Sequence, residues 1–285
     1  MKSLLVFRPI NLLIIACLQA ITYFYLDLRN AQEPIFRWAL ALLILGSILV
    51  TAGGYLFNDY IDKNADRINK PNKVYIDSWS SIGFWLVYLL FNALALLIFF
   101  ILSSKLFFWY AIIIIGLIIY SLILKRLPLI GNIFVSALAA FSIIAVFMLF
   151  QFQNKKMIVL YAGLAALLTY IREIIKDIED ISGDKATGYK TFPVLVGQNQ
   201  SKMIVIMTVV FTMIIYGNLL NSWVLGRFTM PLKGVFIGYQ VVCIFVPLLV
   251  LTVKLYIAES KEDFGKLSSL TKYIMATGML AMLFF

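Results

Sequence analysis

Two stretches of aspartates, residues 58–66 (NDYIDKNAD) and 177–184 (DIEDISGD), hold the side chains best suited to chemistry. In each stretch the three aspartates are three and then four residues apart. Such steps place side chains on one face of a helix, where like charges repel each other by ~0.2–0.5 kcal/mol per pair. We therefore expect both stretches to face a cation. Their members are Asn58, Asp59, Asp62, Asp66, Asp177, Asp180 and Asp184, with Glu173 one turn before the second stretch.

The number of carboxylates favours Mg²⁺ as that cation, because Mg²⁺ prefers oxygen ligands and binds through a few carboxylates together with substrate phosphates. The chain contains no histidine, which excludes imidazole ligands and an imidazole base. Cys17 and Cys243 lie in apolar runs, so the sequence supports neither a disulfide framework nor a zinc site. A diphosphate bridged by Mg²⁺ would have its charge neutralised and become a good leaving group.

Basic and aromatic side chains near the two stretches complete the expected site. Lysine and arginine would hold the remaining phosphate oxygens. A cavity lined by aromatic residues would suit an isoprenoid tail and stabilise a developing allylic cation, for which Tyr120 and Tyr170 are candidates. The basic candidates are Arg67, Lys70, Lys73, Lys125, Arg126, Arg172, Lys176 and Lys190.

The elements that must position these residues are apolar helices. Of the 285 residues, 62% are hydrophobic and 13% are charged, and the mean hydropathy of +0.96 excludes an ordinary soluble globular protein. We predict an all-α, polytopic membrane protein: one domain over residues 1–285, with about nine transmembrane helices around a central cavity. The apolar runs cover residues 9–27, 35–57, 82–103, 107–124, 131–151, 157–176, 202–220, 234–257 and 267–285.

The distribution of positive charge predicts the topology. With the N-terminus in the cytoplasm, most of the 24 lysines and arginines fall on the cytoplasmic side. The net charge of +10 is therefore interpreted as cytoplasmic loop charge, not as a nucleic-acid surface. The first run is interpreted as an uncleaved helix. Both acidic stretches then lie at the cytoplasmic face, which avoids the ~2.5–3.5 kcal/mol cost of a carboxylate at the bilayer centre.

At these residues the chain resembles the UbiA-type intramembrane prenyltransferases. The resemblance rests on the two aspartate stretches, on the start Arg8-Pro9-Ile10-Asn11, on a tyrosine followed by Lys125-Arg126, and on Gly188, Thr191 and Pro193 after the second stretch. It implies Mg²⁺-assisted ionisation of a prenyl diphosphate and transfer of the prenyl group to an acceptor. It also implies catalytic roles for Asp59, Asp62, Asp177, Asp180 and Lys125. Metal binding is implied for Asn58, Asp59, Asp62, Asp66, Asp177, Asp180 and Asp184, and substrate binding for Arg8, Asn11, Asn58, Tyr120, Arg172, Lys176 and Lys190.

Within the family, residues 172–180 (REIIKDIED) and 125–132 (KRLPLIGN) are most similar to the digeranylgeranylglyceryl phosphate synthase branch. Enzymes of that branch transfer a geranylgeranyl group to the hydroxyl of a prenylated glycerol phosphate. The resemblance therefore implies a prenyl diphosphate and a lipid-soluble or amphiphilic acceptor as partners, together with membrane lipid. Residues 67–78 (RINKPNKVYIDS) depart from the branch pattern. An aromatic acceptor, such as a quinone precursor or homogentisate, therefore remains an alternative.

The expected setting is the inner membrane of a bacterial or archaeal cell, with the active site facing the cytoplasm. A cation-coupled transporter is the alternative from another class, but its ion sites would lie near the bilayer midplane on broken helices. A phospholipid-head-group phosphotransferase would also use aspartates with a metal. Its usual spacing of glycines and arginines between the acids is missing here.

Overall fold

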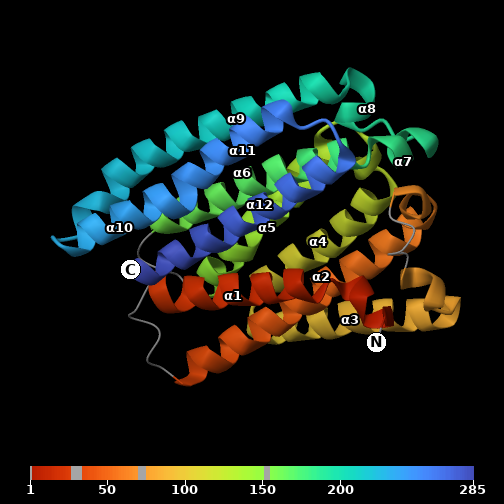
Figure 1. Cartoon of the computed structure of the whole chain (residues 1–285). Coiled ribbons are helices and arrows are strands. Elements are labelled where there is room, and N and C mark those ends of the chain that lie inside the picture. The colour runs from red at the N-terminus through yellow and green to blue at the C-terminus, as the bar shows by residue number, and fades with distance from the viewer. Residues whose placement is uncertain (1, 27–33, 70–74, 151–154) are drawn as a thin grey trace.

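The computed structural model describes residues 2–26, 34–69, 75–150 and 155–285, and its regular elements in these ranges are all helical (Figure 1). The prediction of an all-α membrane protein is confirmed. The α-helices are α1 (Pro9–Leu26), α2 (Pro34–Asn69), α3 (Ser81–Leu102), α4 (Ser104–Leu122), α5 (Ile130–Phe150), α6 (Lys155–Glu179), α7 (Ile181–Ala186), α8 (Phe192–Val196), α9 (Gln198–Leu219), α10 (Leu232–Gln240), α11 (Val246–Ile257) and α12 (Lys261–Leu280).

Eight helical segments of the described chain are long and apolar enough to cross a membrane. They are Arg37–Asn64, Ser81–Leu102, Ser104–Leu122, Ile130–Phe150, Lys155–Glu179, Gln198–Arg227, Leu232–Ile257 and Lys261–Phe284. The expected count of about nine is reached only if α1 is included, as a shorter apolar helix over Pro9–Tyr25. Two of the eight segments are continuous only through π-helical turns, Leu220–Val224 and Val241–Phe245.

The boundaries of two helices differ most clearly from the expected runs. The second run was expected to end at residue 57, but α2 continues to Asn69 and so carries the whole first acidic stretch. At 36 residues α2 is about 54 Å long, well beyond the ~30 Å hydrocarbon core of a bilayer. The last helix begins at Lys261, six residues earlier than expected, because Ser260 and Asp263 form a capping box there.

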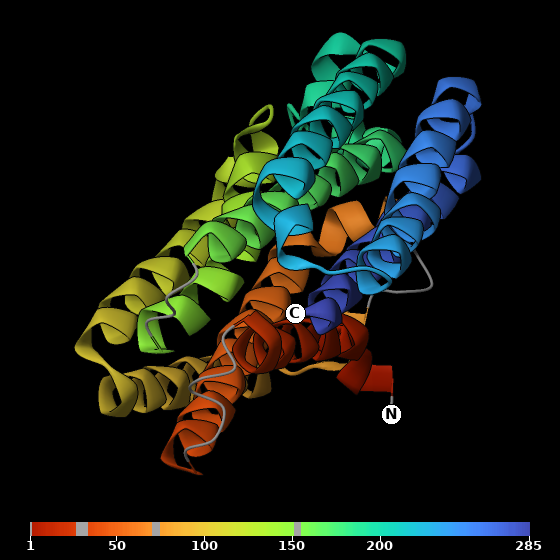
Figure 2. The ribbon, with the colours of Figure 1, turned by 90° about the vertical axis from the view of Figure 1, so that its left-hand side faces the viewer.

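Helix α6 lies at the centre of the bundle and packs against α5, α9 and α12. Its buried residues occur on almost every side, in contrast to α3 and α4, which expose many large apolar side chains to the surroundings. In a membrane protein such exposed apolar faces are expected to meet lipid. Figure 2, viewed from the side that holds the C-terminus, shows α1 beside the end of α12.

One end of the bundle gathers the polar segments. The end of α2, the 3-10 helix Lys2–Phe7, the connection between α4 and α5, and the short helices α7 and α8 all lie at the right-hand end in Figure 1. The end of α2 contacts α7, although the two are more than one hundred residues apart in the sequence. This end of the molecule therefore receives both acidic stretches.

Candidate active site

The first acidic stretch lies on the last turns of α2, where Asp59 meets a cation from another element. Asp59 is 8% exposed and accepts a hydrogen bond from Arg8 Nη2 at 2.5 Å. The Arg8 guanidinium also lies over the ring of Tyr55, 4.7 Å from its centroid. Arg8 directly precedes α1 and has a φ of 50°, in the left-handed region that residues with a Cβ rarely adopt. The ion pair and the ring contact therefore hold a strained residue against α2.

Lys125 is the second cation that meets this stretch. It lies in the 3-10 turn Leu124–Arg126 and its buried ammonium group forms an ion pair with Asp62 and contacts Asn58 Oδ1 at 3.4 Å. Burial lowers the pKa of Lys125, whereas the nearby Asp62 acts in the opposite direction. Gly131 positions this turn by close approach, because a Cβ added to it would lie 2.8 Å from the Cα of Lys125.

The second acidic stretch does not lie on one continuous helix, contrary to expectation. Asp180 leaves the helical dihedral angles, at φ −101° and ψ 7°, so α6 ends just before it and α7 begins just after it. Asp177 stays on α6 and accepts a hydrogen bond from Asn132 Nδ2 of α5 at 2.7 Å. Asp184 lies on α7 and accepts one from Thr191 Oγ1 at 3.1 Å. The spacing of three and four is therefore divided between two helices.

Two tyrosines connect the stretches. Tyr189, which follows α7, donates a hydrogen bond to Asp62 on α2 at 3.1 Å. Burial and the nearby Asp62 raise the pKa of Tyr189 to about 12, so the phenol keeps its proton at neutral pH. Tyr120, at the end of α4, interacts electrostatically with Asp62 and also with Glu173 and Asp177 of α6. Side chains from both stretches therefore border one polar region.

The donor set of this region fits a hard divalent cation. Its ligands are carboxylate and amide oxygens, which Mg²⁺ prefers, and two of its carboxylates, Asp59 and Asp62, already hold the cationic groups of Arg8 and Lys125. In the part of the chain that the structure describes, however, no three acidic or sulfur side chains are near enough to hold a metal ion as they stand. Metal binding would therefore require a carboxylate to exchange its basic partner for the ion.

A second group of basic side chains surrounds Glu173 on α6, and the sequence assigned no role to one of them, Lys272. Arg172 Nη1 donates to Glu173 Oε1 at 2.7 Å, and Lys176 Nζ donates to Glu173 Oε2 at 3.0 Å. Lys272 of α12 interacts electrostatically with all three of these residues. A lysine inside an apolar run was the available indication, because ionisable residues within membrane segments are costly and mark functional sites.

The remaining predicted residues are placed less centrally. Asn11 Nδ2 donates to the Tyr55 hydroxyl at 3.3 Å, beside the ion pair of α1 and α2. Asp66 interacts electrostatically with Arg8 and Lys125, the two cations that contact the first stretch. Lys190 is exposed, and its backbone N–H donates to the carbonyl of Arg126 at 3.0 Å.

Arg67 does not join the site: it pairs with Asp77 at 3.3 Å. Tyr120 stacks on Phe134, with 5.7 Å between ring centroids, and neither Tyr120 nor Tyr170 lines the apolar pocket between the helices that is described next. Lys70 and Lys73 fall outside the described residues.

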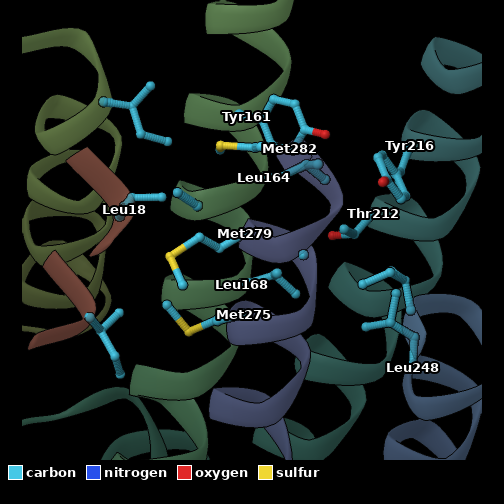
Figure 3. Close-up of a pocket in the computed structure, with 15 residues that line it drawn as sticks. Leu18, Tyr161, Leu164, Leu168, Thr212, Tyr216, Leu248, Met275, Met279 and Met282 are labelled. Carbon is cyan, nitrogen blue, oxygen red and sulfur yellow. The ribbon is translucent and has the colours of Figure 1, made fainter. Parts of the chain in front are cut away.

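An apolar pocket lies inside the bundle, bordered by α1, α5, α6, α9, α11 and α12 (Figure 3). Aliphatic and methionine side chains dominate the lining of this pocket, with Tyr161 and Tyr216 as its aromatic members. Its volume of about 70 Å³ has room for only a few water-sized groups, so a long chain could enter only if flexible side chains moved. The lining residues are Ile14, Leu18, Ile143, Tyr161, Leu164, Ala165, Leu168, Thr212, Tyr216, Ile244, Leu248, Met275, Gly278, Met279 and Met282.

The fold and the site define a class: a polytopic helical membrane protein with carboxylates and cations gathered at one end of the bundle. The sequence profile of the UbiA prenyltransferase family matches residues 16–264. The chain therefore belongs to the UbiA prenyltransferase family.

Among curated relatives, a digeranylgeranylglyceryl phosphate synthase of Natronomonas pharaonis is 33% identical over 57% of this chain and 59% of its own length. The enzyme of the same name from Methanobrevibacter smithii is 32% identical over 72% of each chain. The matched region thus spans about three fifths of the length of the first of these relatives.

Solved structures share the fold. A digeranylgeranylglyceryl phosphate synthase superposes with a TM-score of 0.71 at 23% identity, covering 99% of this chain and 96% of the other. A UbiA homologue from Archaeoglobus fulgidus, bound to DMAPP and Mg²⁺, gives a TM-score of 0.70 at 19% identity and covers 99% of both chains. At these identities the likeness establishes the arrangement of helices and not the substrates.

Proposed function

We propose that this protein is a Mg²⁺-dependent prenyltransferase, acting as one domain over residues 1–285. It transfers a prenyl group, geranylgeranyl in our proposal, from its diphosphate to the hydroxyl of a prenylated glycerol phosphate and releases diphosphate. Family membership and relatives named digeranylgeranylglyceryl phosphate synthase support this proposal. So does a fold neighbour that holds a prenyl diphosphate with Mg²⁺.

The observation that carries the proposal is the pairing of acidic and basic groups from distant segments at one end of the bundle. Asp59 meets Arg8, and Asp62 meets Lys125 and Tyr189. A diphosphate with its counterions needs this combination, because carboxylates attract the cations and basic groups bind the phosphate oxygens. When bound, Mg²⁺ would neutralise the leaving diphosphate.

The residues of the chain have distinct tasks in this proposal. Asn58 and the aspartates of the two stretches (Asp59, Asp62, Asp66, Asp177, Asp180 and Asp184) would hold the metal ions. Lys125 would leave Asp62 and bind an oxygen of the departing diphosphate. Asn132 fixes the orientation of Asp177, and Tyr189 that of Asp62. The acceptor hydroxyl would attack the prenyl carbon as the carbon–oxygen bond to the diphosphate breaks, and its proton would pass to solvent or phosphate.

The site would open toward the cytoplasm, because the described loops at its end of the bundle carry the lysines and arginines that the positive-inside rule places there. The donor and acceptor would reach it from the membrane. A transporter is disfavoured because the two acidic stretches lie at one end of the bundle (Figure 1), whereas ion sites of secondary transporters lie near the midplane.

The decisive experiment supplies purified protein with a labelled prenyl diphosphate, Mg²⁺ and a panel of acceptors. We expect a prenylated glycerol phosphate, no product after chelation of Mg²⁺, and no product with Asp62→Ala or Asp180→Ala. Preferred transfer to an aromatic acceptor would redirect the proposal to quinone chemistry. Absence of transfer to every acceptor, with solute uptake into vesicles instead, would refute it.

A further inference from the structure

Three basic side chains share a half-buried region between α6 and α12. Arg172 and Lys176 lie one turn apart on α6, and Lys272 lies on α12, which packs directly against α6. One carboxylate, that of Glu173, lies among them. We call Arg172, Lys176, Lys272 and Glu173 the α6–α12 cluster.

The charges of the α6–α12 cluster do not balance. Three cations of the cluster face one carboxylate, Glu173, and both of its oxygens are already bonded to Arg172 or Lys176. Asp177, the next residue after Lys176, also attracts Lys176, which still leaves more positive than negative groups. Lys272 is repelled by both of these cations and by Arg8, and attracted to Glu173. Positive charges that are withdrawn from water without a counter-ion are costly. The cluster therefore has the electrostatics of a site for an anion.

The Arg172 side chain supplies a second observation. Its Nε atom is buried and has no hydrogen-bond acceptor among the residues that the structure describes. Buried polar atoms nearly always have a partner in folded proteins, so an atom of this kind indicates a missing ligand or water. A guanidinium with one edge fixed by Glu173 and another edge unsatisfied is suited to bind a planar or tetrahedral oxyanion.

The position of Lys272 differs from that of a lysine in a cytoplasmic loop or at a helix end. It lies eleven residues after the start of α12, about 17 Å along the helix axis. Lys266 of the same helix shows the ordinary arrangement: its side chain is 71% exposed and pairs with Glu262. Lys272 instead lies half-buried against α6 and beside like charges.

The surroundings of the cluster indicate what kind of anion it binds. Leu168, one turn before Arg172 on α6, and Met275, one turn after Lys272 on α12, both line the apolar pocket. In Figure 3 Leu168 and Met275 lie together at one end of the pocket, and Met275 and Met279 of α12 form a row with Met282, which lies just after the end of α12. A ligand bound at the cluster could thus place an apolar tail among flexible methionines.

We propose that Arg172, Lys176 and Lys272 bind the phosphate of the amphiphilic acceptor, with its prenyl tail in the apolar pocket. This inference rests on the proposed function. Glu173 is a positioning residue that holds Arg172 and Lys176 in place. The donor diphosphate is served separately by Lys125 and the aspartates. Arg8 adjoins both subsites, through its bond to Asp59 and its electrostatic interaction with Glu173 and Lys272, so the two substrates would meet beside it.

The test compares Lys272→Met with the matched control Lys266→Met on the same helix. Steady-state transfer is measured with the glycerol phosphate acceptor and with the same lipid lacking its phosphate. We expect Lys272→Met to raise the KM for the phosphate acceptor by about tenfold or more, the loss of one hydrogen bond between charged groups. The KM for the donor and the turnover of the phosphate-free lipid should stay unchanged. Lys272→Arg should recover part of the affinity, and Lys266→Met should behave as the wild type.

Direct binding of the radiolabelled glycerol phosphate lipid, without donor, separates this inference from the proposed function. If the wild type transfers nothing yet binds the lipid more tightly than Lys272→Met does, the proposed function fails and the phosphate site stands. If transfer is normal but Lys272→Met and Glu173→Gln leave the acceptor KM unchanged, or raise the donor KM instead, the phosphate site is refuted. Size-exclusion profiles in detergent identify variants that fail to fold. If Lys272→Met fails to fold, Lys272→Arg decides: a raised KM for the acceptor with an unchanged KM for the donor supports the site, and an unchanged KM for the acceptor or a raised KM for the donor refutes it.

Discussion

Replacement of Gly131 by alanine tests whether the position of Lys125 controls the chemistry. The added Cβ would lie 2.8 Å from the Cα of Lys125 and 3.1 Å from the carbonyl oxygen of Leu124. Both neighbours are backbone atoms, so no side-chain rotation can relieve the clash. The turn that carries Lys125 must retreat by about 0.6 Å to reach ordinary contact at 3.4 Å.

A retreat of this size moves the ammonium group away from Asp62 and from the expected leaving group. Misplacement of a catalytic group by ~1 Å can lower the rate by ~100-fold, so we expect kcat for prenyl transfer to fall by about 10- to 100-fold. The measurement is the single-turnover rate with labelled prenyl diphosphate at saturating Mg²⁺ and acceptor. Thermal unfolding should change little, because alanine favours the helix over glycine by ~0.5–1 kcal/mol and offsets part of the strain.

The matched control is Gly163→Ala on α6. A Cβ at Gly163 meets no atom within 4 Å, so this variant makes the same chemical change without a clash. Its transfer rate should equal that of the wild type. A Gly131→Ala protein that retains the wild-type rate would refute the claim that this close approach sets the position of the lysine.

Three further predictions follow from single contacts. Because burial lowers the pKa of Lys125, its ammonium group loses its proton at a lower pH than an ordinary lysine does. In a pH–rate profile, the rate of prenyl transfer should be full below that pKa and fall as the pH rises through it. Lys125→Arg should move this fall to higher pH. Tyr189→Phe removes one hydrogen bond to Asp62. The net contribution of such a bond is ~0.5–1.5 kcal/mol, so prenyl transfer measured in a Mg²⁺ titration should weaken only several-fold. Complete loss of activity would contradict this prediction. Gly46→Ala would bring a Cβ to 2.6 Å from the Phe99 ring and should lower the Tm in detergent through overpacking that costs ~1–3 kcal/mol; an unchanged Tm would show that the ring moves freely.

The helices were predictable because each apolar run is long and uninterrupted. The boundaries of α2 and α6 were less so. Helix α2 continues beyond its apolar run because residues 58–69 contain neither glycine nor proline. A polar amphipathic segment can extend a helix as well as an apolar segment can. In the second stretch identical spacing suggested the same continuity, but the chain breaks at Asp180. Identical spacing therefore did not ensure identical geometry.

The polar site was predictable in part, since spacing singled out the aspartates and the family resemblance implied a role for Lys125. The partners could not be found locally. Asn132 reaches Asp177 from α5, and Lys272 approaches Arg172 from α12, one hundred residues later in the chain. Such pairs depend on which helices are neighbours in the bundle. The apolar pocket has no local pattern at all, because six helices contribute its walls.

Arg8 shows why the two sides of the site are expected to act together. Its positive φ places the guanidinium between Asp59 on α2 and the α6–α12 cluster. A residue held in this backbone conformation costs ~1–3 kcal/mol, which the contacts with Asp59 and Tyr55 must offset. An ion that displaced Arg8 from Asp59 would free the guanidinium and, with it, the start of α1, which also lines the apolar pocket through Ile14 and Leu18. Binding of an ion to the aspartates would thereby change the position of Arg8 and, through it, the surroundings of the α6–α12 cluster.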